Sequence, residues 1–181
     1  MKRALLFIGH FIFFTIVFPS ILYIIAYLVR SIAGLSYYYG SSVASFLGLS
    51  LVIIGVWIML RAEIDMYRHG GGGTPIPFYS PPQRLVKEGI YRCTRNPMYL
   101  GTTMEYVGIG LHMGEYIMII LAFIILSLAM MLYLKYEMPF LSKRFGDEFN
   151  EYVSSTPLLL PNLGCVLSVL SGQQERREAV K

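Results

Sequence analysis

Charged residues are scarce in this sequence. Asp, Glu, Lys and Arg make up 14% of the 181 residues, whereas a soluble domain usually carries about a quarter. Three stretches lack these residue types altogether: Ala4–Val29, Ser42–Leu60 and Ile117–Leu134. Each approaches or exceeds the roughly 18–20 residues needed to cross a bilayer. The composition excludes an ordinary soluble domain and predicts an all-α protein with several membrane spans.

A fourth apolar block, Tyr99–Met113, is shorter and contains Glu105. We expect it to be the third of about four transmembrane helices. The first block is too long for the roughly 7–15 apolar residues of a cleavable signal peptide, and no A-x-A site follows it. We therefore expect it to remain as the first span.

Cysteine and histidine are also rare. Cys93 and Cys165 form no metal-binding pattern, and their positions give no reason to expect a disulfide. His10 and His112 stand alone near span ends, without a His, Cys or carboxylate partner at metal-ligand spacing. The sequence thus predicts no metal site.

The segment GGGGTPIPFYSPP lies in a long loop, residues 67–97, between the second and third spans. Its Gly and Pro content excludes a regular helix. The glycine run is not a phosphate-binding loop, since no Gly-Lys-Ser/Thr follows it. Two interpretations stay open for this loop: a flexible crossing segment, or a lid over a site that includes Phe78 and Tyr79.

Positive residues are distributed unevenly about the spans. With four spans and both termini inside, 14 of the 15 Lys and Arg fall on one face, which the positive-inside rule assigns to the cytoplasm. The net charge of +4 is then explained by a face that meets anionic lipid, without a nucleic-acid partner.

An amphipathic helix is predicted after the last span. Its apolar stripe has helical spacing and consists of Met138, Leu141, Phe145, Phe149 and Tyr152. We expect this helix to lie on the membrane or on the inner loop, although Gly146 interrupts it. Pro157 and Pro161 then stop regular structure, and residues 173–181 are a charged tail.

Two polar clusters adjoin the spans, Leu85–Gly101 and Tyr136–Pro161. Folding should bring both to one membrane surface, where they could share a site. Arg95 is either a lipid anchor or a cation that holds a carboxylate in bidentate fashion. Glu137 is either a solvated acid or an acceptor for the ammonium group of a zwitterion.

The Asn96-Pro97 step is typical of a helix start, with the asparagine as cap and the proline in the first turn. Such a start also presents free backbone N–H groups to a ligand. Tyr99 is either an interface aromatic or a cofactor wall. Gly101 permits close approach of a backbone or of a ligand.

Glu105 lies about two turns inside the third span. An acid at that depth is costly and usually faces a cavity or a partner. It is therefore either a structural hydrogen-bonder or a wall of the pocket, in contact with the polar head of a substrate below Arg95.

These motifs resemble the isoprenylcysteine carboxyl methyltransferase and phospholipid methyltransferase superfamily of integral membrane enzymes. The resemblance covers about residues 85–161 and rests on L-V-x-x-G-x-Y-R-x-x-R-N-P-x-Y-x-G, followed by E-x-P-x-L-x-x-x-F-G-x-x-F-x-x-Y. It implies S-adenosylmethionine as methyl donor and a lipophilic acceptor that arrives from the bilayer.

The resemblance and the residue patterns described above together predict site residues and an organisation. Residues 1–66 would form a two-helix hairpin, 67–161 the catalytic region and 162–181 a tail. Arg95, Glu105 and Glu137 are the predicted catalytic residues. The predicted cofactor-binding residues are Leu85, Val86, Gly89, Tyr91, Arg95, Asn96, Pro97, Tyr99, Leu100, Gly101, Glu137, Arg144 and Tyr152.

The chain departs from the family pattern at two positions. Asn96 stands where histidine is common, and it cannot act as a base. Glu137 is followed by Met138 instead of a second glutamate. With few evident bases, the sequence mildly favours an acceptor that is already ionised, such as an isoprenylcysteine-like carboxylate, over a phospholipid amine.

Two other functions fit the sequence. A membrane sterol or steroid reductase would bind NADPH near Arg84, Lys87 and Arg92. A non-catalytic lipid-binding or channel-like subunit would leave both polar clusters unexplained.

The charge distribution yields a topology test. Reporter fusions at residues 36, 80 and 181 should report outside, inside and inside, because the positive loops stay in the cytoplasm. An outside signal at residue 80 would contradict a site shared between the two clusters.

Overall fold

A computed structural model of the protein describes residues 2–36, 40–71 and 82–171. Within these ranges every regular element is helical, as predicted. The elements are α1 Lys2–Ile12, η1 Phe13–Val17, α2 Phe18–Ile32, α3 Ser42–His69, η2 Gly89–Arg92, α4 Pro97–Met113, α5 Tyr116–Leu132, η3 Tyr133–Glu137, α6 Met138–Phe145, α7 Asp147–Ser155 and α8 Leu163–Leu170.

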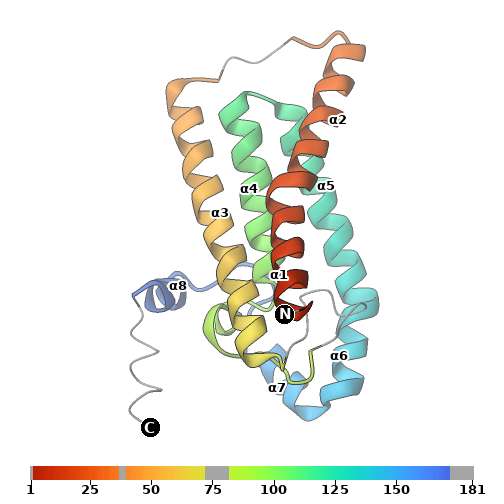
Figure 1. The fold of residues 1–181 in the computed structure, drawn as a ribbon, viewed down its shortest axis with the longest axis vertical. Helices are drawn as coiled ribbons and strands as arrows, with labels where there is room; N and C mark the ends of the chain where they lie inside the picture. Colours follow the sequence, from red (N-terminus) through yellow and green to blue (C-terminus); the bar gives the residue numbers. More distant parts are fainter. Residues whose placement is uncertain (1, 37–39, 72–81, 172–181) are drawn as a thin grey trace.

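The long helices form an upright bundle (Figure 1). In the described residues, three are long and apolar enough to cross a membrane: Leu5–Ile32, Ser42–His69 and Tyr116–Phe145. Many large apolar side chains on them point outward, which in water would be costly and in lipid is not. The chain is therefore an integral membrane protein.

Helix α4 stands inside this bundle beside α3 and α5 (Figure 1). It has 17 residues, Pro97–Met113, and rises about 25 Å at 1.5 Å per residue. That is slightly less than the roughly 30 Å of the hydrocarbon core. Its role as a fourth span stays a proposal.

Glycines set the contact between α3 and α4. A Cβ on Gly48 would lie 2.6 Å from the carbonyl oxygen of Gly108, and one on Gly55 would lie 2.6 Å from that of Gly101. Such contacts allow the two backbones to approach closely, as small residues do between membrane helices. Gly101 thus makes room for a backbone, one of the two options that the sequence left open.

The amphipathic segment after the last span is not one helix, contrary to prediction. Residues Met138–Phe145 continue α5 through η3, and α7 begins anew at Asp147. Gly146 separates them with φ 57° and ψ −130°, a conformation open mainly to glycine. The apolar stripe nevertheless gathers in one cluster, in which Leu141, Phe149 and Tyr152 pack with Leu85 of the inner loop.

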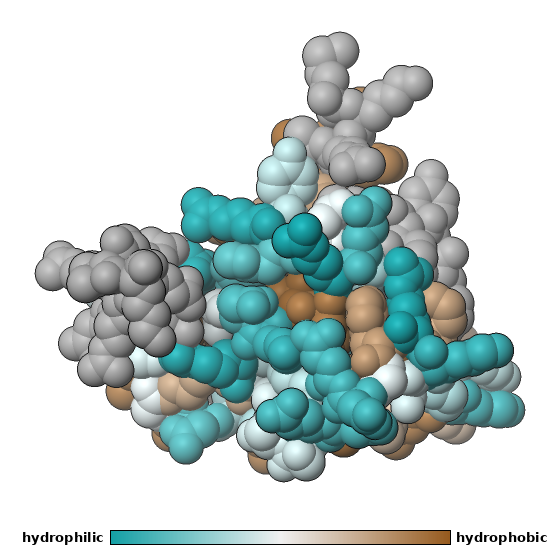
Figure 2. All heavy atoms as spheres, turned by 90° about the horizontal axis from the view of Figure 1, so that it is seen from below, coloured by the Kyte–Doolittle hydropathy of each residue, from teal (hydrophilic) through white to brown (hydrophobic). Residues whose placement is uncertain are grey.

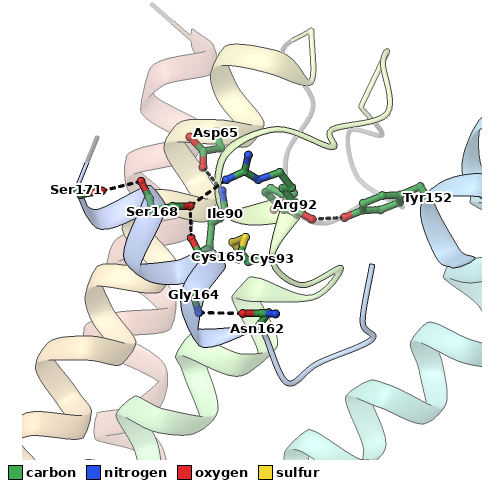
Figure 3. The surroundings of a disulfide bond; sticks show 11 residues. Asp65, Ile90, Arg92, Cys93, Tyr152, Asn162, Gly164, Cys165, Ser168 and Ser171 are labelled. Carbon is green, nitrogen blue, oxygen red and sulfur yellow. Dashed lines mark hydrogen bonds between the residues drawn. A yellow bond between two sulfur atoms is a disulfide. The ribbon is translucent and has the colours of Figure 1, made fainter. Parts of the chain in front are cut away.

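The two cysteines form a disulfide, which the sequence gave no reason to expect. Cys93 follows η2, and Cys165 lies on α8. Helix α8 lies at the side of the bundle, to the left of the lower part of α3 in Figure 1, and the hydrogen bond from Arg92 Nη2 to Ser168 Oγ (3.0 Å) runs beside the disulfide (Figure 3). The topology expected from the positive residues would place this face in the cytoplasm, where disulfides are rare.

The glycine contacts predict a specific weakness. In Gly101→Ala the new Cβ would lie 2.6 Å from Met59 Cγ and 2.7 Å from the Gly55 oxygen. Overpacking of this kind costs about 1–3 kcal/mol, so the thermal unfolding temperature in detergent should fall. Gly9→Ala is the matched control, because nothing lies within 4 Å of its Cβ and alanine favours helix. Equal melting of the two variants would contradict a close α3–α4 contact.

Candidate active site

Backbone and side-chain hydrogen bonds join the two polar clusters predicted from the sequence. The backbone N–H of Arg95 donates to the Pro157 oxygen (3.0 Å), and Asn96 Nδ2 donates to the Leu158 oxygen (2.9 Å). Tyr152 Oη donates to the Tyr91 oxygen (2.7 Å). The chain after α7 therefore closes directly over the segment that precedes α4, which confirms that folding brings the clusters together.

Asp65 on α3 fixes the loop that carries the first cluster. Its Oδ2 accepts from the Ile90 N–H (2.8 Å), and Arg61 Nη2 lies 3.3 Å from its Oδ1. Gly89 has φ +59°, and a Cβ there would lie 2.0 Å from Asp65 Oδ2. Gly89 is thus required for the attachment of the loop to α3, which is made where Asp65 meets Ile90 (Figure 3).

A cavity lies between these segments, with about 480 Å³ of empty space including its open mouth. From this end of the bundle, hydrophilic side chains surround a hollow with a hydrophobic floor (Figure 2). The cavity is lined by Met66, Pro82, Leu85, Val86, Tyr91, Arg95, Tyr133, Glu137, Leu141, Phe149 and Tyr152. Six of these are predicted cofactor-binding residues, drawn from both clusters.

The charged groups of the cavity are Arg95 and Glu137. In the described part of the chain, Arg95 Nε and Nη1 are buried without a hydrogen-bond partner. Tyr99 Oη lies 3.5 Å from Glu137 Oε2, a long hydrogen bond. Glu137 and Tyr133 belong to the π-helical turn η3, an irregularity that is frequent at functional sites.

Two cavity tyrosines stay neutral near pH 7. Burial raises the pKa of the Tyr91 hydroxyl well above its usual value, and the carboxylate of Glu63 raises it further. Burial likewise raises the pKa of the Tyr152 hydroxyl. Both side chains can therefore donate hydrogen bonds, whereas neither can serve as a base at that pH.

Several predicted site residues do not line this cavity. Asn96 is the N-cap of α4, but its side chain does not cap the helix and bonds Leu158 instead. Arg144 is exposed and stacks over Phe145. Those outside the lining are Gly89, Asn96, Pro97, Tyr99, Leu100, Gly101, Glu105 and Arg144.

Glu105 is buried in α4, with 2% of its surface exposed. A Cβ on Gly55 would lie 2.7 Å from the Glu105 N–H nitrogen, so this turn faces α3. Its Oε2 has no partner among the described residues. Contact with an acceptor stays a prediction for this residue, and Phe78 and Tyr79 lie outside the described residues.

Sequence reasoning passed over two buried acids near the site and treated His10 as isolated. Glu63 and Asp65 are buried acids in the last turns of α3, and the argument applied to Glu105 would have identified both. His10 contacts Glu63 through Nδ1, across 53 positions of sequence. In the described ranges, no three His, Cys, Asp or Glu residues gather as a possible metal site.

The family model for phospholipid methyltransferases matches residues 43–148, which is more than half of the chain. The chain belongs to the phospholipid methyltransferase family. The match begins in α3, earlier than the resemblance at about residues 85–161 suggested, and ends in α7. No curated protein and no solved structure matches the chain.

Membership of this family implies a membrane methyltransferase. The matched residues include nine of the eleven residues that line the cavity, since only Phe149 and Tyr152 lie beyond position 148. The cavity is therefore the candidate active site.

Proposed function

We propose that this protein transfers a methyl group from S-adenosylmethionine to a lipophilic acceptor that it reaches from the membrane. The observation that carries the proposal is the guanidinium of the partly buried Arg95, whose Nε and Nη1 nitrogens are buried without a partner among the described residues and which lines a cavity with Glu137. Unsatisfied buried donors are costly, so a ligand with an acceptor group is their natural partner.

The methionine part of S-adenosylmethionine fits these groups. Its carboxylate suits the planar fork of Arg95, and its ammonium group suits Glu137. Apolar side chains and the neutral hydroxyls of Tyr91 and Tyr152 line the rest of the cavity and suit the remainder of the molecule. When bound, S-adenosylmethionine supplies an activated methyl group, while the protein positions the reactants and excludes water.

We place this site on the cytoplasmic side, with α4 as the third of four spans. The Lys and Arg distribution supports this orientation. In this arrangement residues 1–66 form a membrane hairpin and residues 67–161 the catalytic region. The acceptor is an isoprenylcysteine-like carboxylate or a phospholipid.

The reductase alternative receives less support from the geometry. The cations proposed for the NADPH phosphate are partly engaged elsewhere. Lys87 Nζ pairs with Glu148 at 2.7 Å, and Arg92 bonds Ser168. A non-catalytic subunit would not explain why Arg95, with two buried unpartnered nitrogens, lines one cavity with Glu137.

The cofactor assignment can be tested by calorimetry. Loss of one charge-assisted contact should cost roughly 1.5–3 kcal/mol, or about 10- to 150-fold in affinity. Arg95→Ala and Glu137→Ala should each weaken S-adenosylhomocysteine binding by that factor. Arg92→Ala is the matched control, because Arg92 is exposed and faces α8. It should bind as the wild type does.

Two outcomes would contradict this assignment. Unchanged affinity in both cavity variants would remove Arg95 and Glu137 from the donor site. Binding of NADPH in place of S-adenosylhomocysteine, with loss in Arg92→Ala, would favour the reductase instead.

Glu105 requires a separate test, since it faces α3 and does not line the cavity. Glu105→Gln keeps the shape and removes any charge. The geometry favours a structural role, so we expect turnover with labelled S-adenosylmethionine and the affinity for S-adenosylhomocysteine both to stay near wild type. A fall in turnover of about tenfold at constant affinity would instead support contact with the acceptor.

A further inference from the structure

Helix α8 turns large apolar side chains away from the protein. Leu163, Leu167 and Leu170 are 77%, 64% and 53% exposed, and their spacing along the chain places them on one face of the helix. The helix sequence, LGCVLSVL, contains no charged residue. An exposed apolar face of this kind marks a contact with a partner or with a membrane.

The opposite side of α8 is attached to the segment that precedes α4. Cys165 is bonded to Cys93, and Ser168 Oγ accepts the hydrogen bond from Arg92 Nη2 (Figure 3). Val169, on the same side, is buried. The polar contacts of α8 therefore face the protein and its leucines face outward, which is the reverse of a surface helix in water.

The level of α8 along the bundle identifies what lies against its leucines. In α3 the run without charged residues, Ser42–Leu60, spans about 28 Å at 1.5 Å per residue. This length is close to the roughly 30 Å of the hydrocarbon core, so the core ends near Arg61. Val166 of α8 packs on the cluster that contains Ile58 and Ala62, which lie on either side of that position. Figure 1 shows α8 beside this lower part of α3.

The outer surface of α3 continues the apolar region that α8 presents. Leu60 and Ile53 are exposed on the span Ser42–His69, where lipid is their surroundings. Helix α8 has eight residues and a length of about 12 Å, too short to cross the bilayer. A short helix without charge, placed at the end of the hydrocarbon core, fits the acyl chains next to the head groups. Helices of this kind bury their apolar face about 5–10 Å into that boundary.

We propose that α8 is an interfacial helix whose leucine face lies among the acyl chains next to the head groups and holds the Cys93 segment at the membrane boundary. Tyr91 and Arg95 lie two residues to either side of Cys93 and line the candidate active site. The rim of that site is thereby attached to the lipid surface as well as to α3. This inference does not depend on the identity of the methyl donor or acceptor.

Depth-dependent fluorescence quenching tests the position of α8. The full chain with Leu167→Trp is placed in phosphatidylcholine vesicles whose acyl chains carry bromine either near the head group or near the chain end. Trp57 is the one native tryptophan, and its signal is measured in the wild type and subtracted. Bromine near the head group should quench the new tryptophan about twofold, and more than bromine near the chain end does, because the helix lies at the boundary. Leu163→Trp, on the same face, should behave alike.

Two control variants calibrate the depth. Ile53→Trp lies eight residues before Arg61 on α3, deeper in the hydrocarbon core, and bromine near the chain end should quench it more. Ser154 is exposed on α7, which lies at the lower end of the bundle (Figure 1). Aqueous iodide should quench Ser154→Trp, whereas neither brominated lipid should do so.

Two results would overturn the interfacial position. If iodide alone quenches Leu167→Trp, the leucine face lies in water. If neither iodide nor brominated lipid quenches it, protein covers the face, as in a dimer formed through α8.

The attachment of the Cys93 segment has its own test. Leu163→Gln combined with Leu167→Gln removes the apolar contact with lipid and leaves the disulfide in place. Backbone amides of residues 89–95 should then exchange hydrogen about threefold faster in vesicles, because a weaker contact raises the open population. Ser154→Gln is the control and should exchange as the wild type does. Equal exchange in the double variant and the wild type would show that α8 does not hold this segment.

Discussion

The close contact of α3 with α4 is the constraint on which the rest of this structure depends. Gly48 meets Gly108, and Gly55 meets Gly101, with backbone oxygens where side chains would otherwise stand. Two contacts seven residues apart fix the antiparallel register of the helices. The last turns of α3 then lie beside the residues that precede α4. This register lets the Asp65 carboxylate accept the Ile90 N–H, since neither group could reach the other after a shift of one turn.

The geometry of the candidate site depends on this hydrogen bond between Asp65 and Ile90. The loop held by Asp65 carries Tyr91 and Arg95, and their backbone groups bond Tyr152 and Pro157. The chain from Tyr152 to Pro157 is therefore held against this loop, because the Tyr152 hydroxyl and the Pro157 oxygen both find their hydrogen-bond partners there. Burial of the Nε and Nη1 atoms of Arg95 is a consequence of this closure. A surface arginine would gain little from a carboxylate ligand in water, whereas a buried one gains more, because its competing hydration has already been removed.

Much of this arrangement could be predicted from the sequence, because it depends on local pattern. Uncharged runs identify the spans, and Asn96-Pro97 marks the start of α4. What could not be predicted depends on contacts between distant positions. Cys93 and Cys165 are 72 residues apart, and no spacing rule pairs them. The break at Gly146 was visible only as a weakness in a periodic stripe, since a glycine can either continue or end a helix.

His10 and Glu63 are a second example of a contact between distant positions that the sequence could not predict. Each looks isolated in the sequence, and only the packing of α1 on α3 brings them into contact. A buried acid in a span is nevertheless a signal in itself, because lipid offers it no partner. Glu63 lies at the level of the candidate active site, whereas Glu105 lies deeper between two helices. Two cavities flank the end of α3, and the charged groups are divided between them: Arg95 and Glu137 line one, and Glu63 and Arg68 line the other. The packing of α3 against α1 on one side, and against the loop before α4 on the other, therefore decides which charged side chains face each cavity.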